Sequence, residues 1–210
     1  MKREPEPELM DLPDEVEAYA RADFSQVNQA FVDRLLELAP QPRAKAVDLG
    51  TGPGEIPIRL AIARPRWRIT ALDASAPMLE VARRAAKGRG IRFVLGDAKS
   101  SPLPSGAFDV VFSNSLLHHV ASPARFWAGV KRIAKPGAVV FVRDLFRPAS
   151  KRAARAIVEK HAGDESPLLQ EEFYRSLLSA YTIGEVRSQL KTAGLDLSAR
   201  KITDRHLEVS

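Results

Sequence analysis

The chain has 210 residues, 45% of them hydrophobic, which is enough to bury the core of one globular domain. It contains no cysteine, so structural disulfides, thiolate zinc sites, cysteine nucleophiles and cysteine-ligated iron–sulfur clusters are excluded. The formal net charge is +6, but the 32 lysines and arginines are scattered and do not form one basic stripe interleaved with aromatic residues, so nucleic acid is an unlikely partner.

The N-terminal residues 1–14 are dominated by proline and glutamate and predict a disordered tail, because this composition offers little to bury. The first eight residues are too acidic and too rich in proline for a signal peptide. No apolar run in the chain approaches the length that spans a bilayer. We therefore expect a cytoplasmic protein without a membrane span.

Two helices are predicted between this tail and the first strand. Residues 15–21 are a short candidate. Residues 25–38 are a stronger one, because Val27, Phe31 and Leu35 recur at the spacing that places them on one helical face.

The glycine turn, Val47-Asp48-Leu49-Gly50-Thr51-Gly52-Pro53-Gly54, follows a short apolar run and precedes a run of helical periodicity. Its context is therefore strand, tight turn and helix. The next apolar run, residues 67–72, predicts a second strand that ends at Asp73. A carboxylate at that position can accept both hydroxyls of a ribose across the crevice of a doubly wound sheet. Together the two features predict a pocket for an adenosine-containing ligand.

The spacing of the glycines narrows the choice of ligand. Dinucleotide-binding turns have the pattern G-x-G-x-x-G, whereas this turn has G-x-G-x-G, with Pro53 and Glu55 beside its third glycine. Proline removes an amide donor and glutamate adds negative charge, so both disfavour a pyrophosphate. A zwitterionic amino acid joined to adenosine, as in S-adenosylmethionine (SAM), fits better, because Asp48 or Glu55 can meet its ammonium group.

The remaining predicted elements alternate between strands and helices, as a doubly wound fold requires. A capping box begins the last helix, and the alternation of the closing hairpin is weak. In chain order we expect strands at 91–95 and 107–114, a helix at 123–133, a strand at 138–143, helical residues over 148–178 with a break at 163–167, a helix at 183–192, and a hairpin of residues 195–199 and 206–209.

Over about residues 44–145 these motifs resemble the class I (Rossmann-like) SAM-dependent methyltransferases, and in particular those that act on small molecules such as quinones and secondary metabolites. The resemblance implies an α/β fold with a doubly wound, mostly parallel seven-stranded sheet, a C-terminal antiparallel hairpin, helices on both faces and an N-terminal helical lid. It implies SAM as cofactor, S-adenosylhomocysteine as product, a small-molecule acceptor, and a monomer or homodimer. The expected organisation is a tail (1–14) and one domain (15–210), which comprises the lid (15–40), the cofactor-binding core (44–145), a helical substrate-side insertion (146–182) and a C-terminal helix and hairpin (183–210).

The resemblance also implies roles for individual residues. The acid at position 97 holds the adenine amino group in this family, and Met78 would cover the adenine face. Tyr19, in the lid, would reach the methionine carboxylate. The full set of expected cofactor-binding residues is Tyr19, Asp48, Gly50, Thr51, Gly52, Gly54, Asp73, Ala74, Met78, Gly96, Asp97, Ala98, Asn114 and Ser115.

Methyl transfer from a sulfonium is an in-line displacement, so the protein mainly positions the two reactants and excludes water. A base is needed only if the acceptor loses a proton, and the candidates are His119 and, second, His118. We expect no metal, because His118 and His119 lack the i, i+4 spacing of two ligands on one helical face. Positions near the carboxyl edge of the sheet suggest substrate-side roles for Asp144, Arg147, Tyr174 and Tyr181.

Three other functions stay open at this stage. A nucleic-acid methyltransferase is one, although Ser113-Asn114-Ser115-Leu116 lacks the [DN]-P-P-[YFW] tetrad of enzymes that methylate base amino groups. A non-catalytic SAM-binding partner protein is the second. The third is an enzyme that uses SAM on the same fold without transferring its methyl group.

Overall fold

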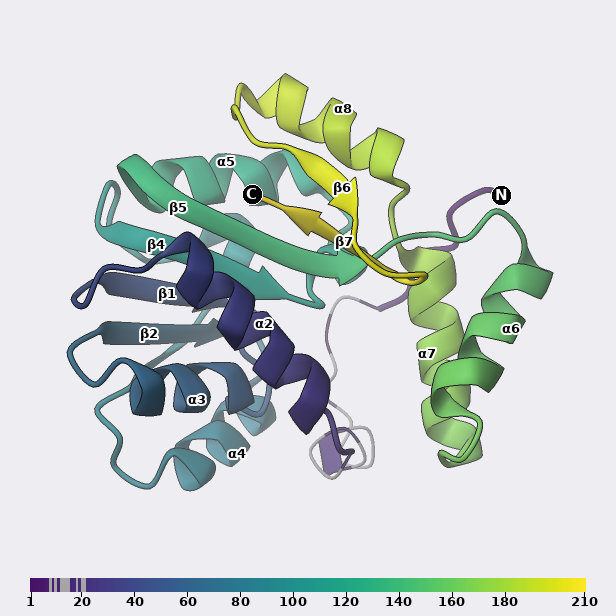
Figure 1. Ribbon diagram of the computed structural model, residues 1–210, viewed down its shortest axis with the longest axis horizontal. Helices are drawn as coiled ribbons and strands as arrows, with labels where there is room; N and C mark the ends of the chain where they lie inside the picture. The colour runs from purple at the N-terminus through teal and green to yellow at the C-terminus, as the bar shows by residue number, and fades with distance from the viewer. Residues whose placement is uncertain (8, 10, 12–15, 18, 20–21) are drawn as a thin grey trace.

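The computed structural model describes residues 1–7, 9, 11, 16, 17, 19 and 22–210. A seven-stranded sheet with the order β3-β2-β1-β4-β5-β7-β6 forms its centre (Figure 1). The first five strands run parallel, and β7 pairs antiparallel with both β5 and β6. The strands are β1 (Lys45–Leu49), β2 (Arg68–Asp73), β3 (Arg92–Leu95), β4 (Phe108–Asn114), β5 (Ala134–Leu145), β6 (Ala199–Lys201) and β7 (His206–Val209).

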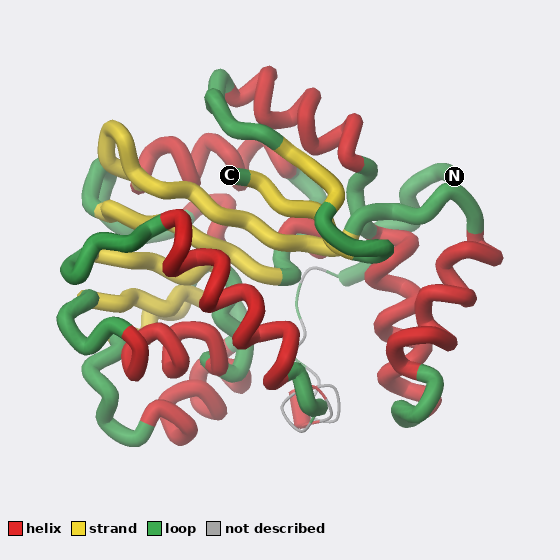
Figure 2. Tube along the Cα trace, viewed as in Figure 1, coloured by secondary structure: helices red, strands yellow, loops and turns green. Residues whose placement is uncertain are grey.

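Helices cover both faces of this sheet (Figure 2). Apolar side chains of α2 and α3, such as Phe31 and Leu60, pack with Phe112 of β4 and Phe141 of β5 on one face. Side chains of α5 and α8, such as Trp127, pack on the other. These helices are α2 (Ser25–Leu38), α3 (Glu55–Ala63), α4 (Ala76–Ala86), α5 (Pro123–Ile133) and α8 (Ile183–Ala193). The predicted doubly wound fold is confirmed, although α2 is a layer of the core, whereas the sequence suggested a lid over residues 15–40.

An antiparallel helical hairpin stands beyond the ends of the strands. α6 (Lys151–Ala162) and α7 (Pro167–Ser179) pack through their own small cluster, which includes Val158 and Leu177. In Figure 1 this hairpin lies on the side to which the parallel strands point. The hairpin corresponds to the predicted helical segment 148–178, and its turn lies at the predicted break.

The N-terminal tail contacts the folded body, whereas its composition predicts disorder over residues 1–14. The Arg3 guanidinium donates hydrogen bonds to the carbonyls of Ser179 and His118, and the Glu6 amide donates to Ser179 Oγ at 3.3 Å. Arg3 and Glu6 of the tail therefore have partners in the folded body. Residues 8, 10, 12–15, 18, 20 and 21 lie outside the described residues, and with them much of the predicted helix 15–21.

Two strands differ from their predicted bounds. β5 begins at Ala134, four residues early, because the Lys135-Pro136-Gly137 turn is absorbed into the strand where its register with β4 shifts between Phe108 and Val110. β6 spans Ala199–Lys201, later than the predicted 195–199, because its pairing with β7 sets the register. The other strands with predicted bounds, and the helices α2, α5 and α8, begin and end within two residues of those bounds, whereas α6 begins three residues after the predicted start at 148.

Candidate functional site

The glycine turn joins β1 to α3 at the point where the strand order reverses, since β1 pairs with both β2 and β4. Ligands bind at such switch points, outside the carboxyl ends of the strands. The amides of Gly50 and Thr51 both donate to the carbonyl of Leu72, the penultimate residue of β2. The amide of Gly52 donates to Asp73 Oδ2 at 2.7 Å. The turn is therefore fixed to the end of the neighbouring strand.

Asp73 organises both turns that meet at this edge. Besides the Gly52 amide, its carboxylate accepts from the Ser75 amide at 2.8 Å, at the start of α4. Burial raises the pKa of Asp73, and the amide hydrogen bonds oppose that rise. Each carboxylate oxygen has a further lone pair. Asp73 can therefore hold the loop and still accept ribose hydroxyls.

Gly52 borders open space. A Cβ atom added there would have no atom of the described residues within 4 Å, whereas one added at Gly54 would approach Ala82 Cβ to 2.8 Å. A Cβ at Gly50 would meet the side chain of Leu116 at the same distance. The outer glycines thus permit close packing, and the middle one leaves room for a ligand.

Asp48 lies under the turn with 2% of its surface exposed. Its Oδ2 accepts from the Thr51 hydroxyl at 2.7 Å. Burial raises the pKa of Asp48 to about 7, and the nearby Asp73 adds to that rise while Thr51 opposes it. A cation in the pocket would favour the ionised carboxylate.

Two further segments flank the same edge. Asp97 follows β3, where its carboxylate accepts from the Lys99 amide at 2.7 Å and pairs with Lys99 Nζ at 2.8 Å. Partial burial favours a higher pKa for Asp97, but Lys99 outweighs it and the pKa lies below its usual value. Met78 is 3% exposed in the first turn of α4, as a core residue would be. Gly96 and Ala98 adjoin Asp97 in the chain, and Ala74 adjoins Asp73, so their predicted roles depend on those of the two acids.

The end of β4 contains an unusual backbone conformation. Ser115, directly after Asn114, has a φ of 54°, which is rare for residues other than glycine. Its amide donates to the carbonyl of Arg143 at the end of β5. Strained residues that are held by their surroundings are concentrated at functional sites. The strain at Ser115 is consistent with its predicted place beside the reacting groups.

Tyr19 is influenced by the charges of acids near the carboxyl edge of the sheet. Burial raises the pKa of its hydroxyl to about 12, and the charges of Asp144, Asp73 and Glu55 contribute. Its ring lies 5.0 Å from that of Phe24. The charges of these three acids thus act on Tyr19, and its role toward the cofactor stays a prediction.

His118 and Asp144 form a buried pair. His118 lies in the 3-10 turn η2 (Leu117–His119), and its Nδ1 is 2.6 Å from Asp144 Oδ1. Asp144 also accepts hydrogen bonds from the amides of Leu117 and Leu145. Burial disfavours the charged ring, but Asp144 and then Glu6 outweigh it and raise the pKa of His118. Asp144 thus orients His118, whereas the sequence suggested a substrate-side role.

His119 has different surroundings. Its Nδ1 lies 3.2 Å from the carbonyl oxygen of Pro7 and 3.3 Å from Glu6 Oε1. Burial and the adjacent His118 lower its pKa to about 3. A ring with that pKa is a weak general base at neutral pH. Sequence reasoning missed Glu6, because nothing in a proline- and glutamate-rich tail marks one glutamate for a contact with a histidine at position 119.

The other predicted substrate-side residues have structural partners. Arg147 donates to the carbonyls of Met1 and Ala180 and pairs with Glu185 at 2.7 Å. The Tyr181 hydroxyl donates to the carbonyl of Val120. Tyr174 is 8% exposed beneath the Arg155 guanidinium, whose carbon is 3.4 Å from the ring centre. Arg147 and Tyr181 thus join the hairpin end and α8 to the segments that follow β5 and β4, whereas Tyr174 holds α6 and α7 together.

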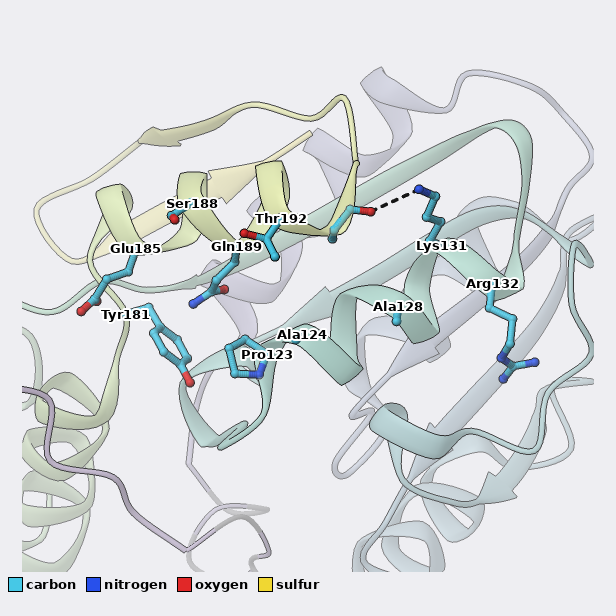
Figure 3. Close-up of a pocket in the computed structure, with 11 residues that line it drawn as sticks. Pro123, Ala124, Ala128, Lys131, Arg132, Tyr181, Glu185, Ser188, Gln189 and Thr192 are labelled. Atoms are coloured by element: carbon cyan, nitrogen blue, oxygen red, sulfur yellow. Dashed lines mark hydrogen bonds between the residues drawn. The ribbon is translucent and has the colours of Figure 1, made fainter.

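A cleft of about 730 Å³ lies elsewhere, between α5 and α8 (Figure 3). Its lining includes Pro123, Ala128 and Gln189, and Lys131 closes one end with a hydrogen bond to the carbonyl of Ala193. Apart from Tyr181, none of the residues predicted for the site lines it. The cleft is therefore separate from the glycine turn.

Comparisons with known proteins agree with this geometry. A family described as "Methyltransferase domain" matches residues 47–142. A demethylmenaquinone methyltransferase of Thermus thermophilus is 35% identical over 124 residues, which are 58% of this chain and 54% of the relative. Its counterpart in Thermotoga maritima is 27% identical over 177 residues, 80% of this chain and 75% of the relative. A solved SAM-dependent methyltransferase from Aquifex aeolicus has a TM-score of 0.71 at 19% identity, covering 95% of this chain and 97% of that chain.

These similarities cover only part of the length of several relatives. The matches with the first three curated relatives span only 31% to 54% of the length of those relatives. The similarity to the Aquifex aeolicus protein, at 19% identity, establishes the fold. Among the described helices, none has both the length and the apolar character needed to cross a bilayer.

Proposed function

We propose that the chain is a class I SAM-dependent methyltransferase that transfers the methyl group of SAM to a small-molecule acceptor; the match to the methyltransferase domain family and the similarity to methyltransferase relatives support this. The observation that carries the proposal is the glycine turn, fixed by Asp73 at the switch point of the sheet with open space at Gly52. Relatives named as demethylmenaquinone methyltransferases favour a quinone-like acceptor.

The residues present fit SAM. Asp73 would accept the ribose hydroxyls, and Asp97, at the end of the adjacent strand, would accept the adenine amino group. Asp48 would balance the positive charge of the amino acid portion from beneath the turn, because its pKa of about 7 allows ionisation when a cation approaches. When bound, SAM supplies an activated methyl group on a sulfonium.

The chain's own residues then position the acceptor and exclude water, which is what an in-line displacement requires. Asn114 and Ser115, at the end of β4, would lie beside the methyl group, and Tyr19 with the adjacent ring of Phe24 would cover the cofactor from the N-terminal side. We assign no histidine base, because His118 is held by Asp144 and the pKa of His119 is about 3. An acceptor that is already nucleophilic matches this arrangement.

Calorimetric titration with SAM tests the binding step. The wild type should bind SAM, and Asp73→Ala should bind it at least about tenfold more weakly, the loss expected for hydrogen bonds to a charged group. Asp196→Ala, which removes an exposed acid between α8 and β6, is the matched control and should leave the affinity unchanged. Absence of binding to the wild type, or equal affinity in Asp73→Ala, would overturn the proposal.

Incubation with methyl-labelled SAM and a metabolite extract tests the transfer step. We expect S-adenosylhomocysteine and a labelled small molecule as products. Methylthioadenosine as product would mean that SAM is used for another reaction. SAM binding without any product would indicate a non-catalytic SAM-binding protein. Methyl label found in RNA would indicate that the acceptor is a nucleic acid.

A further inference from the structure

Three side chains with metal-ligating atoms meet at the carboxyl edge of β4 and β5. Glu6, His118 and His119 each have one possible ligand atom within 4.8 Å of those of the other two. Glu6 Oε1 is 3.6 Å from His118 Nε2 and 3.3 Å from His119 Nδ1. Neither histidine lies on a helix at i, i+4 spacing, so the sequence pattern did not predict the cluster.

One oxygen of the Glu6 carboxylate is buried without a hydrogen bond from the described residues. Its side chain is 6% exposed, and Oε1 is buried with no hydrogen bond from any described residue. The other oxygen, Oε2, accepts from Ser176 Oγ at 3.4 Å. A buried anionic oxygen that faces two imidazole nitrogens without a hydrogen bond is costly unless a cation joins them.

The surroundings of His118 match those of a metal-binding histidine. Such a ring usually donates its second N–H to a carboxylate, which fixes the tautomer and the ring orientation. Here Nδ1 pairs with Asp144 at 2.6 Å, so Nε2 is the nitrogen that faces Glu6. Asp144 is itself fixed by two backbone amides.

We propose that Glu6, His118 and His119 bind a divalent transition-metal ion. Metal–ligand distances of about 2.0–2.2 Å in a tetrahedral site put neighbouring ligand atoms about 3.4 Å apart, close to the two distances measured to Glu6 Oε1. His119 binds through Nδ1, so its proton resides on Nε2 and its contact with the Pro7 carbonyl is given up. Three protein ligands leave a fourth position for water.

The donor set determines the class of ion. Two imidazoles and one carboxylate suit zinc and divalent iron, cobalt or nickel, whereas magnesium prefers oxygen ligands alone. Glu6 and Asp144 together carry the two negative charges that balance such an ion. Because Glu6 comes from the tail, the ion would also fix the tail to the body.

The test uses the full chain without SAM, so its failure is distinct from failure of the proposed methyl transfer. After removal of metals with a chelator, titration with Co²⁺ should give one equivalent of binding with a visible absorption spectrum. Zn²⁺ should displace it, and Mg²⁺ should not. Glu6→Gln should weaken Co²⁺ binding at least about tenfold. Glu4→Gln is the matched control, because Glu4 is an exposed acid of the same tail that pairs with Lys151.

A second readout is thermal unfolding. Zn²⁺ should raise the unfolding temperature of the wild type and of Glu4→Gln, and should leave that of Glu6→Gln and His119→Gln unchanged. Absence of a Co²⁺ spectrum in the wild type would overturn the proposal. Equal affinity of the wild type and Glu6→Gln would also overturn it.

Discussion

The buried carboxyl group of Asp48 makes folding stability depend on pH. Its pKa of about 7 in the folded protein lies above the ordinary value near 4, mainly because of burial. A raised pKa means that the folded state binds more protons than the unfolded state between these values, so the stabilising contribution is complete below pH 4 and is lost as the pH rises through 7. We predict that the unfolding free energy falls over this range by up to about 1.4 kcal/mol per pH unit more in the wild type than in Asp48→Asn.

Urea denaturation of both proteins between pH 4.5 and 8 measures this difference. Titrating groups that do not interact with Asp48 contribute equally to the two proteins, so the difference reports Asp48 together with its coupling to Asp73. The Asn side chain also keeps an oxygen for the Thr51 hydroxyl. Parallel pH profiles for wild type and variant would show that Asp48 is ionised in the folded protein.

At the scale of single residues, the sequence predicted the part of the site that is formed by neighbouring strand–turn–helix motifs. Gly52 and Asp73 are 21 residues apart, yet a strand–turn–helix context places them on adjacent strand ends, and the structure joins them by a hydrogen bond. The role of Asp144 depends on His118, and that of Glu6 on Ser179 and Ser176. No periodicity or spacing encodes such contacts between distant loops.

At the scale of elements, apolar periodicity and capping residues predicted most boundaries. The capping box at Thr182 begins α8, and both of its reciprocal hydrogen bonds are present. β5 was predicted too short, because proline and glycine at 136 and 137 mark a turn in sequence. In the sheet these residues lie within the strand at a register shift that sequence patterns do not encode.

Two glycines of the turn have different roles: Gly54 allows α3 to pack closely against α4, and Gly52 leaves space for a ligand. In Gly54→Ala the new methyl group would press on Ala82 of α4, as well as strain a φ of 82°. In Gly52→Ala the strain at a φ of 52° is similar, but no described atom is close. We predict that Gly54→Ala destabilises the fold by about 2–4 kcal/mol, and Gly52→Ala by about 1 kcal/mol.

For SAM affinity we expect the reverse: the substitution at Gly52 should weaken binding more than the substitution at Gly54 does. Gly52→Ala places a methyl group in the space assigned to SAM, so its affinity should fall at least about tenfold in a protein that remains folded. Denaturation and calorimetry of both variants measure the two effects. If Gly52→Ala binds SAM as the wild type does, the ligand does not lie against this glycine.

Across the whole molecule, ion pairs join side chains of different helices and strands. Arg34 of α2 and Arg200 of β6 both pair with Glu208 of β7, which is 2% exposed. Lys160 pairs with Asp204 between α6 and the β6–β7 turn. These cations hold elements together, and because each is balanced by an acid they contribute little to the net charge of +6.

The N-terminal tail joins the helical hairpin to the edge of the sheet. The Arg3 guanidinium donates to carbonyls of both η2 and α7, and its carbon lies 4.2 Å from the centre of the Tyr181 ring. We predict that Arg3→Ala lowers the unfolding free energy by about 1–3 kcal/mol, since two buried carbonyls lose a charged donor. Hydrogen exchange should accelerate in α7 and η2, while amides in the centre of the sheet keep their protection.

Lys2→Ala is the matched control, since Lys2 is an exposed cation next to Arg3 in the same tail. It should leave both the denaturation midpoint and the exchange pattern unchanged. Uniform acceleration throughout the sheet in Arg3→Ala would show that the tail contributes to global stability without a specific junction. Unchanged exchange in α7 would show that the hairpin is held by Arg147, which reaches α8 and the carbonyl of Ala180 independently of Arg3.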